Sequence, residues 1–312
     1  MESPGNNSSK IKLAIGCVAD NNNKFLDQAL RLLKSWRWYA LPYEKSDFYL
    51  CVVASLPAEY RKEYEKYGAI IKIVPRFSSQ YPVCNKLCFL ETEGLQQYDR
   101  VLLFDCDTII VQNPGELISG DMFKAKIADG PTVPLNIFEN LFSAFGLSMP
   151  EATERCTVKN NITIPYFNTG VLSFTRNNMI QLLPEWILLT KNLIEKIGVL
   201  EGRTHFCEQA SFSLAMAKTR TPFVAIGNKM NFPAHHDTLP LDSDLANIDP
   251  VIIHYHWLVD EKGLLKSSPY PRVNERIEKF NSRLIKEAAA EDNVFGKNFK
   301  KVKNLITHYF QC

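Results

Sequence analysis

The sequence has no long run of apolar residues and no marked excess of charge of either sign. No stretch reaches the ~18 consecutive apolar residues that a membrane-spanning helix needs, so no transmembrane segment is expected. Lysine and arginine together number 36 and aspartate and glutamate 34, and no basic stripe stands out. This balance argues against a nucleic acid partner, because nucleic acids are bound by clustered basic side chains.

Paired cysteine motifs are also missing. The eight cysteines are scattered without a CxxC motif, and the spacing of Cys84 and Cys88 is more typical of one helix face than of a metal site. Residues 1–10 are polar and lack the apolar core of a signal peptide, so we expect them to form a disordered leader. Together these features predict a cytoplasmic protein with reduced cysteines.

What the sequence does contain is a regular alternation of strand-like and helix-like segments. With 312 residues, of which 46% are hydrophobic, the chain can bury the core of one large domain or two small ones. The first part predicts strands at 11–19, 48–54 and 69–74, with helices at 25–39 and 57–67 between them. Strands that alternate with helices indicate an α/β fold with a mostly parallel central sheet.

The rest of the chain is less uniform. Residues 121–165 are expected to be irregular, because prolines interrupt them. Elsewhere the patterns predict helices at 81–95, 179–197, 208–216 and 273–290 and strands at 101–104, 171–174, 222–226 and 251–257. A basic segment at 297–303 is interpreted as a solvated face, with weak membrane-surface contact as the alternative.

Two acids at the end of the apolar run 101–104 are the strongest functional signal. Asp105 and Asp107 follow a segment typical of a strand buried on both faces, and Asn113-Pro114-Gly115 then indicates a turn. Ligands of open α/β sheets bind at the carboxyl ends of such strands. Two neighbouring carboxylates suit Mg²⁺ or Mn²⁺, whereas the alternative is a pair of solvated turn acids.

Polar side chains at three other segment ends are further candidates. Asn168 precedes the short strand at 171–174, although alone it reads as a turn residue. Glu208 and Gln209 open a helix, where they could instead cap it or offset the macrodipole. His254 and His256 end the last strand-like run, and residues two apart on a strand share a face.

Taken in order, the DxD after a strand, Phe-Asn-Thr-Gly-Val at 167–171, Glu208-Gln209 and Ile-Ile-His-Tyr at 252–255 resemble a known family. They look like the retaining GT-A glycosyltransferases of family 8, which include glycogenin and bacterial lipopolysaccharide galactosyltransferases. The resemblance covers residues 11–270. It implies a single GT-A catalytic domain there, with the leader at 1–10 and a C-terminal helical extension at 271–312.

The resemblance also implies roles for individual residues. Asp105, Asp107 and His254 would bind Mn²⁺ or Mg²⁺ against the diphosphate of a nucleotide sugar, and Asn168, Glu208 and Gln209 would line the reacting sugar. The remaining donor contacts would be Ala19, Asp20, Lys86, Cys106 and a lysine after His254. The family usually has Asp-Gln where this chain has Glu208-Gln209, and its lysine stands nearer the histidine, so either Lys262 or Lys266 would contact the diphosphate.

The function expected from this resemblance is metal-dependent transfer of a hexose from a nucleotide-diphosphate sugar, with UDP as the nucleotide and retention at the anomeric carbon. The acceptor would be a hydroxyl of a glycan, a protein or a small molecule. Because no well-placed nucleophile is evident, front-face displacement is favoured over a covalent intermediate.

Two other functions stay open at this point. Residues 104–108 also resemble the DxD of haloacid-dehalogenase phosphatases, although those place it on the first strand and follow it with glycine. The other alternative is an inactive sugar-nucleotide-binding protein, although such a protein would tend to lose Asp105, Asp107 and His254.

Overall fold

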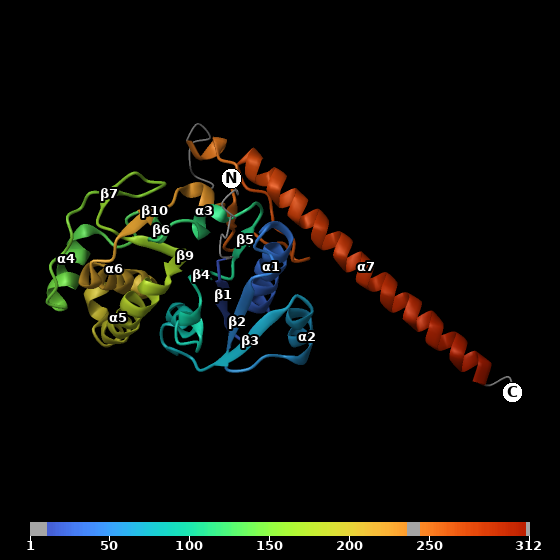
Figure 1. Cartoon of the computed structure of the whole chain (residues 1–312). Helices are drawn as coiled ribbons and strands as arrows, with labels where there is room; N and C mark the ends of the chain where they lie inside the picture. The colour runs from blue at the N-terminus through green and yellow to red at the C-terminus, as the bar shows by residue number, and fades with distance from the viewer. Residues whose placement is uncertain (1–10, 236–243, 310–312) are drawn as a thin grey trace, which may run out of the picture.

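A seven-stranded sheet forms the centre of the molecule (Figure 1). The computed structural model describes residues 11–235 and 244–309. The strands lie in the order β10-β6-β9-β4-β1-β2-β3, and all neighbours are parallel except that β9 is antiparallel to β4 and β6. Their bounds are β1 Leu13–Ala19, β2 Asp47–Val53, β3 Ala69–Val74, β4 Arg100–Phe104, β6 Phe123–Ile127, β9 Phe167–Thr175 and β10 Phe223–Ala225. The expected α/β class with a mostly parallel sheet is confirmed.

Helices cover both faces of this sheet. Helices α1 and α2 pack on one face, and α5, α6 and the 3-10 helix η1 pack on the other (Figure 1). The α-helices are α1 Asn23–Tyr39, α2 Ala58–Lys66, α3 Gly115–Ile118, α4 Leu135–Ala144, α5 Arg176–Glu195, α6 Cys207–Thr219 and α7 Pro271–Tyr309. The 3-10 helices are η1 Pro82–Phe89, η2 Leu95–Gln97, η3 Ile197–Leu200, η4 Thr204–Phe206, η5 Asn228–Met230 and η6 Asp244–Asn247.

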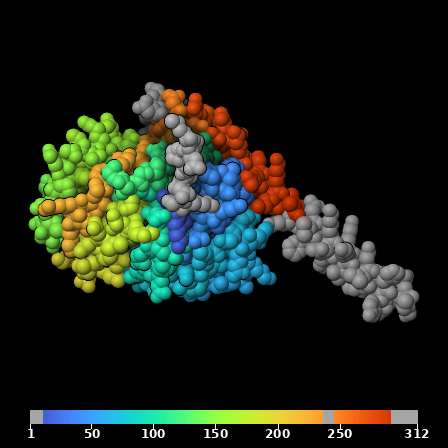
Figure 2. All heavy atoms as spheres, viewed as in Figure 1, coloured from blue at the N-terminus to red at the C-terminus, as the bar shows by residue number. Residues whose placement is uncertain are grey.

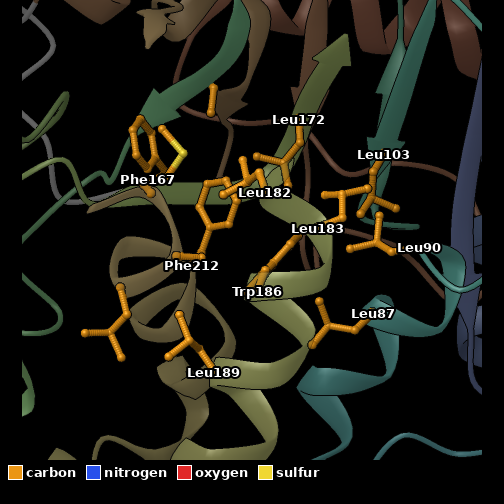
Figure 3. Packing of buried hydrophobic residues seen from close by; sticks show 14 of the residues in the cluster. Leu87, Leu90, Leu103, Phe167, Leu172, Leu182, Leu183, Trp186, Leu189 and Phe212 are labelled. Carbon is orange, nitrogen blue, oxygen red and sulfur yellow. The ribbon is translucent and has the colours of Figure 1, made fainter. Parts of the chain in front are cut away.

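Strand β4 shows why the apolar run before the two acids is continuous. Val101 and Leu103 join the core under α5 and α6, whereas Leu102 and Phe104 join the core under α1. Successive residues of a strand point to opposite faces, so a strand covered on both sides is mostly apolar on both. Figure 3 shows Leu103 near the strand residue Leu172, with Trp186 and Phe212 below them.

Strand β6 was not predicted, since its segment was expected to be irregular. Its sequence alternates apolar residues with Lys124 and Lys126, and both lysines are buried. The ammonium of Lys126 pairs with Asp129 and donates to Asn231 O at 2.8 Å. Lysines are rarely buried unless they are paired, so two of them in a short segment suggested an exposed stretch of chain. In the structure this segment is a strand inside the sheet.

The predicted helix at 81–95 was also wrong in extent and type. The segment forms η1 and then a turn before η2. Phe89 at the end of η1 packs directly over Gly16 of β1, where an added Cβ would lie 2.0 Å from its ring. This close approach lets η1 lie flat on the sheet and positions Lys86 beside the carboxyl ends of the strands.

A second, smaller sheet carries the segment that was predicted as the last core strand. It has the order β11-β12-β5, with β11 Phe232–Pro233, β12 Ile252–His254 and β5 Thr108–Ile110. Strand β12 is short and antiparallel to β5, so it lies outside the central sheet. His256 lies beyond β12 with a left-handed φ of 52°, so the expectation that both histidines leave one strand was wrong. A hairpin of β7 Glu154–Arg155 and β8 Ile162–Thr163 makes the third sheet.

Helix α7 begins against the outside of the molecule (Figure 2). Its residues Val273, Ile277 and Phe280 are buried with Trp38 of α1. The helix predicted at 273–290 is part of this longer helix. The basic segment 297–303 falls within α7, whereas the leader at 1–10 lies outside the described residues. Within the described residues, no helix is both long and apolar enough to cross a membrane. The division at residue 270 stays a prediction.

Candidate active site

Three side chains that can ligate a metal meet where β4 and β12 end. Asp107 lies in the loop after β4, and its Oδ1 is 3.1 Å from His254 Nε2 while its Oδ2 is 3.6 Å from His256 Nδ1. The two imidazole rings stack with centroids 3.9 Å apart and planes 19° from parallel. One ligand atom from each residue lies within 4.8 Å of the others. We call Asp107, His254 and His256 the Asp-His-His cluster.

Burial and mutual charge set the protonation of this cluster. Burial would raise the pKa of Asp107, but His254 outweighs burial through its charge and hydrogen bond and lowers that pKa to about 2. Burial would lower the pKa of His254, but the Asp107 carboxylate raises it above the ordinary value. Burial, with His254 close by, lowers the pKa of His256 to about 2. The cluster therefore contains a carboxylate, a histidine that favours its protonated form and a neutral imidazole.

An amide network holds His254 from its other side. His254 Nδ1 lies 3.2 Å from Asn231 Oδ1, and Asn231 Nδ2 donates to Asn168 Oδ1 at 3.2 Å. The same Asn168 oxygen accepts from the Gly170 N–H at 2.9 Å. A Cβ on Gly170 would lie only 2.6 Å from His254 Cε1, so glycine is required for this close approach. A bond from Nδ1–H to a carbonyl oxygen fixes the tautomer in which Nε2 can ligate a metal.

The donor set of the cluster fits a divalent transition metal. One carboxylate and two imidazoles suit ions such as Mn²⁺, whereas Mg²⁺ prefers an all-oxygen shell. Nε2 of His256 is buried and has no hydrogen-bond partner among the described residues. Buried polar atoms normally have a partner, so this nitrogen is available to a ligand. Asp107, His254 and His256 are therefore the residues that could hold a cation.

Asp105 faces a different group. Its Oδ1 lies 2.7 Å from Lys86 Nζ, and the same ammonium lies 3.2 Å from Glu208 Oε1. The Thr169 hydroxyl donates to the Glu208 carboxylate at 2.7 Å. We call Lys86, Asp105, Glu208 and Thr169 the lysine–carboxylate group. Its members come from η1, the loop after β4, α6 and β9, so four separate segments build it.

The charges of the lysine–carboxylate group depend on one another. Burial raises the pKa of Glu208, although the Lys86 charge opposes this. Burial would lower the pKa of Lys86, but Asp105 and Glu208 raise it above its ordinary value. Glu208 does not cap α6, the alternative considered from sequence, because its carboxylate contacts Lys86 and Thr169 instead. The Thr169 hydroxyl is shared between its two oxygens, and Oε1 also lies beside the Lys86 ammonium.

Gln209, next to Glu208, is oriented by the hydroxyl group of the buried Tyr166. The Tyr166 hydroxyl donates to Gln209 Oε1 at 3.0 Å and lies 2.6 Å from Thr132 Oγ1. With its carbonyl oxygen engaged in this way, the amide N–H₂ is the end that can donate to a ligand.

Sequence reasoning missed Asp129 and Asn231. Asn168 Nδ2 donates to Asp129 Oδ2 at 3.1 Å, so Asp129 joins the same network as His254. Asp129 closely follows the carboxyl end of β6, much as Asp105 follows β4. That position would have marked it as a candidate had the strand been recognised, whereas Asn231 has no comparable signal.

Asp20, which was predicted to contact the nucleotide-sugar donor, lies directly after β1. Its Oδ1 lies 3.2 Å from Arg76 Nη1 and accepts from Asn85 Nδ2 at 3.3 Å. Asn85 precedes Lys86 on η1, so this helix links Asp20 to the lysine–carboxylate group. Ala19 is fully buried.

Three other predicted contacts lie in different surroundings. The Cys106 thiol is buried in the core and donates to Gln28 Oε1 at 3.5 Å. Lys262 lines a cavity of about 550 Å³ with residues of α1 and α7. The Lys266 N–H donates to Leu258 O at 3.0 Å. Among the described residues, neither lysine forms an ion pair with Asp105 or Asp107.

Comparison with known proteins identifies a matching family model and several solved structures of similar fold. A family model described as a Rhodobacterales glycosyltransferase domain matches residues 23–220. The structure is similar to the galactosyltransferase LgtC in complex with donor and acceptor sugar analogs, with 17% identity, a TM-score of 0.54 and coverage of 86% of this chain and 95% of that one. The structure is also similar to mouse xyloside xylosyltransferase 1, with 13% identity and a TM-score of 0.50, over 78% of this chain and 98% of that one.

The glycosyltransferase GlyE of Streptococcus pneumoniae is similar at 17% identity and a TM-score of 0.50, over 90% of this chain. The chain spans only 65% of the length of GlyE. No curated protein sequence is similar enough to support a comparison. At these identities the structural likenesses establish the fold, which is the GT-A fold that the sequence motifs predicted. Since the family model covers nearly two thirds of the chain, this protein belongs to the Rhodobacterales glycosyltransferase domain family.

Proposed function

We propose that the protein transfers a hexose from a nucleotide-diphosphate sugar, with UDP as the nucleotide, to a hydroxyl of a glycan, a protein or a small molecule. The observation that carries the proposal is the Asp-His-His cluster beside the lysine–carboxylate group at the carboxyl edge of the sheet. Ligands of open α/β sheets bind at this edge. The solved structure of LgtC with donor and acceptor sugar analogs belongs to a protein of the same fold.

The proposed metal ligands are Asp107, His254 and His256. Asp105, expected from the motif to be a ligand, is paired with Lys86 instead and would join the shell only if that pair opened. When bound there, a divalent cation supplies Lewis-acid stabilisation of a diphosphate leaving group. Of the two expected ions, manganese is the better match, because magnesium is a harder cation that prefers oxygen ligands throughout.

The chain's own residues would bind and orient the donor sugar. The Gln209 amide, held by Tyr166, would donate a hydrogen bond to the sugar. Asn168 and Asp129 supply further polar atoms from the same network. Fixing the reacting groups in this way contributes to the rate by removing translational and rotational freedom before reaction.

We propose retention through front-face displacement. The carboxylate of Glu208, the buried acid next to Gln209, is engaged by Lys86 and Thr169. An amide such as Gln209 is a poor nucleophile, so a covalent sugar–enzyme intermediate has little support. The acceptor hydroxyl would instead lose its proton to an oxygen of the departing diphosphate.

Release of UDP from a panel of UDP-sugars, with and without Mn²⁺, tests the proposal. We expect one UDP-hexose to be consumed with Mn²⁺, and Asp107→Asn to abolish the reaction while the protein stays folded. Hydrolysis of p-nitrophenyl phosphate would instead favour the phosphatase alternative. Manganese-dependent UDP binding without turnover of any donor would favour an inactive binding protein.

A further inference from the structure

Two cysteines far apart in the sequence meet behind the lysine–carboxylate group. Cys84 lies on η1 and Cys207 begins α6, 123 positions later, yet their sulfur atoms are 3.0 Å apart. Both side chains are completely buried. Of the seven cysteines that the structure describes, these are the two whose sulfurs are in contact.

The distance between these sulfurs is close to what a covalent bond requires. A disulfide has an S–S length of ~2.05 Å, so about 1 Å of approach separates the two thiols from a bond. The elements that carry them already pack together, because Leu87 of η1 and Ala210 of α6 belong to the same buried cluster. A rotation of the two side chains could therefore close the bond without moving η1 away from α6.

We propose that Cys84 and Cys207 are an oxidative modification site, which forms a disulfide when the chain folds in the presence of a small-molecule disulfide such as oxidised glutathione. The thiolate of one cysteine attacks a glutathione sulfur and releases one glutathione thiolate. The second cysteine then attacks the mixed disulfide and releases the other glutathione. Overall two protein thiols give up two electrons and two protons, and one glutathione disulfide becomes two thiols.

The surroundings of the pair determine when this exchange is fast. In the folded protein the contact with Cys207 and burial raise the pKa of Cys84, so the reactive thiolate is scarce. The native dithiol should therefore react slowly, and the bond should form while η1 and α6 are still docking. Once closed, the buried bond is shielded from reducing thiols, in contrast to the reduced cysteines expected from spacing alone.

A bond at this position should stabilise the fold. It would close a loop of 123 residues, and long loops restrict the unfolded chain the most in the chain-entropy description. We expect the oxidised form to unfold at a temperature higher by on the order of 5 °C. The proposal does not depend on the identity of the sugar donor, because its readouts are a covalent bond and a midpoint of unfolding.

The experiment compares protein refolded from urea in oxidised and in reduced glutathione. Free thiols are alkylated, and the digest is searched for a peptide that joins Cys84 to Cys207 with the loss of two hydrogens. The bond should form in the wild type and in Cys156→Ser, and it should be lost in Cys84→Ser and Cys207→Ser. Should refolding fail, the same readouts are taken on native protein held in oxidised glutathione with sub-denaturing urea.

Each result decides the proposal. The joined peptide together with a higher midpoint in the wild type and in Cys156→Ser, but not in Cys84→Ser or Cys207→Ser, supports it. Full alkylation of both cysteines in oxidised, natively folded protein overturns it. A bond that involves Cys156 or Cys88 in place of this pair also overturns it.

Discussion

Gly170→Ala is the change that tests most sharply whether His254 is a metal ligand. The new Cβ would lie 2.6 Å from His254 Cε1 and 2.8 Å from its Nδ1. Carbon atoms in contact normally stay ~3.5 Å or more apart, so the ring must move by about 1 Å. The backbone of Gly170 is not in the left-handed region, so the effect comes from crowding of His254 and of Asn168 Oδ1, which would lie 3.0 Å from the new Cβ.

Such a displacement should weaken metal binding while leaving the fold intact. Loss of the contacts that orient a metal ligand typically costs ~10- to 100-fold in metal affinity. Overpacking should also lower the free energy of unfolding by about 1 to 3 kcal/mol. Isothermal titration with Mn²⁺ measures the first effect and urea denaturation the second.

Gly198→Ala is the matched control for this variant. Gly198 lies in η3, and no atom lies within 4 Å of an added Cβ there. This variant should bind Mn²⁺ like the wild type and be unchanged in stability or slightly more stable. Should Gly170→Ala bind Mn²⁺ as tightly as Gly198→Ala, His254 is not a ligand and the reasoning from the cluster fails.

Other changes in the site have equally direct outcomes. Asp107→Asn should remove the Mn²⁺-dependent rise in the thermal midpoint that UDP produces, and a full rise would contradict the metal site. His254→Ala and His256→Ala should each lower Mn²⁺ affinity by at least ~10-fold, whereas normal affinity in one variant would exclude that histidine. Because the raised pKa of His254 means that a proton competes with the metal, Mn²⁺ affinity should rise from pH 6 and level off only above that pKa; a flat titration would contradict this. Glu208→Gln should lower the free energy of unfolding by about 2 to 4 kcal/mol, since buried Lys86 loses a carboxylate, and an unchanged urea midpoint would show that the remaining carboxylate suffices.

The parts of the fold that sequence predicted well are those whose burial is mainly apolar. Strand β4 is apolar on both faces, and α1 has one apolar stripe from Leu26 to Trp36, so periodicity revealed both. Strand β6 was missed because lysines are usually exposed, whereas Lys124 and Lys126 are buried against partners such as the Glu116 and Asn231 carbonyls. Local periodicity contains no information about such partners.

Helix η1 illustrates a second limit. Buried residues at spacings of three and four, such as Cys84, Leu87 and Cys88, predicted an α-helix. The chain instead forms a 3-10 helix, whose last residue, Phe89, packs against Gly16 on a strand more than seventy positions earlier. The sequence therefore predicted a helical turn but not its type or its end.

The division of the DxD motif between two groups is the feature that sequence could least predict. Residues two apart share a face only on a strand, and here the chain turns after β4, where the Thr108 N–H donates to Asp105 O. The two carboxylates therefore diverge, Asp105 towards Lys86 on η1 and Asp107 towards His254 at the end of β12 and His256 beyond it. Lys86 sets the direction of Asp105 and the histidines set that of Asp107, and these partners come from segments distant in the sequence. The motif therefore indicates where a site lies, whereas the rest of the fold determines which acid faces the metal.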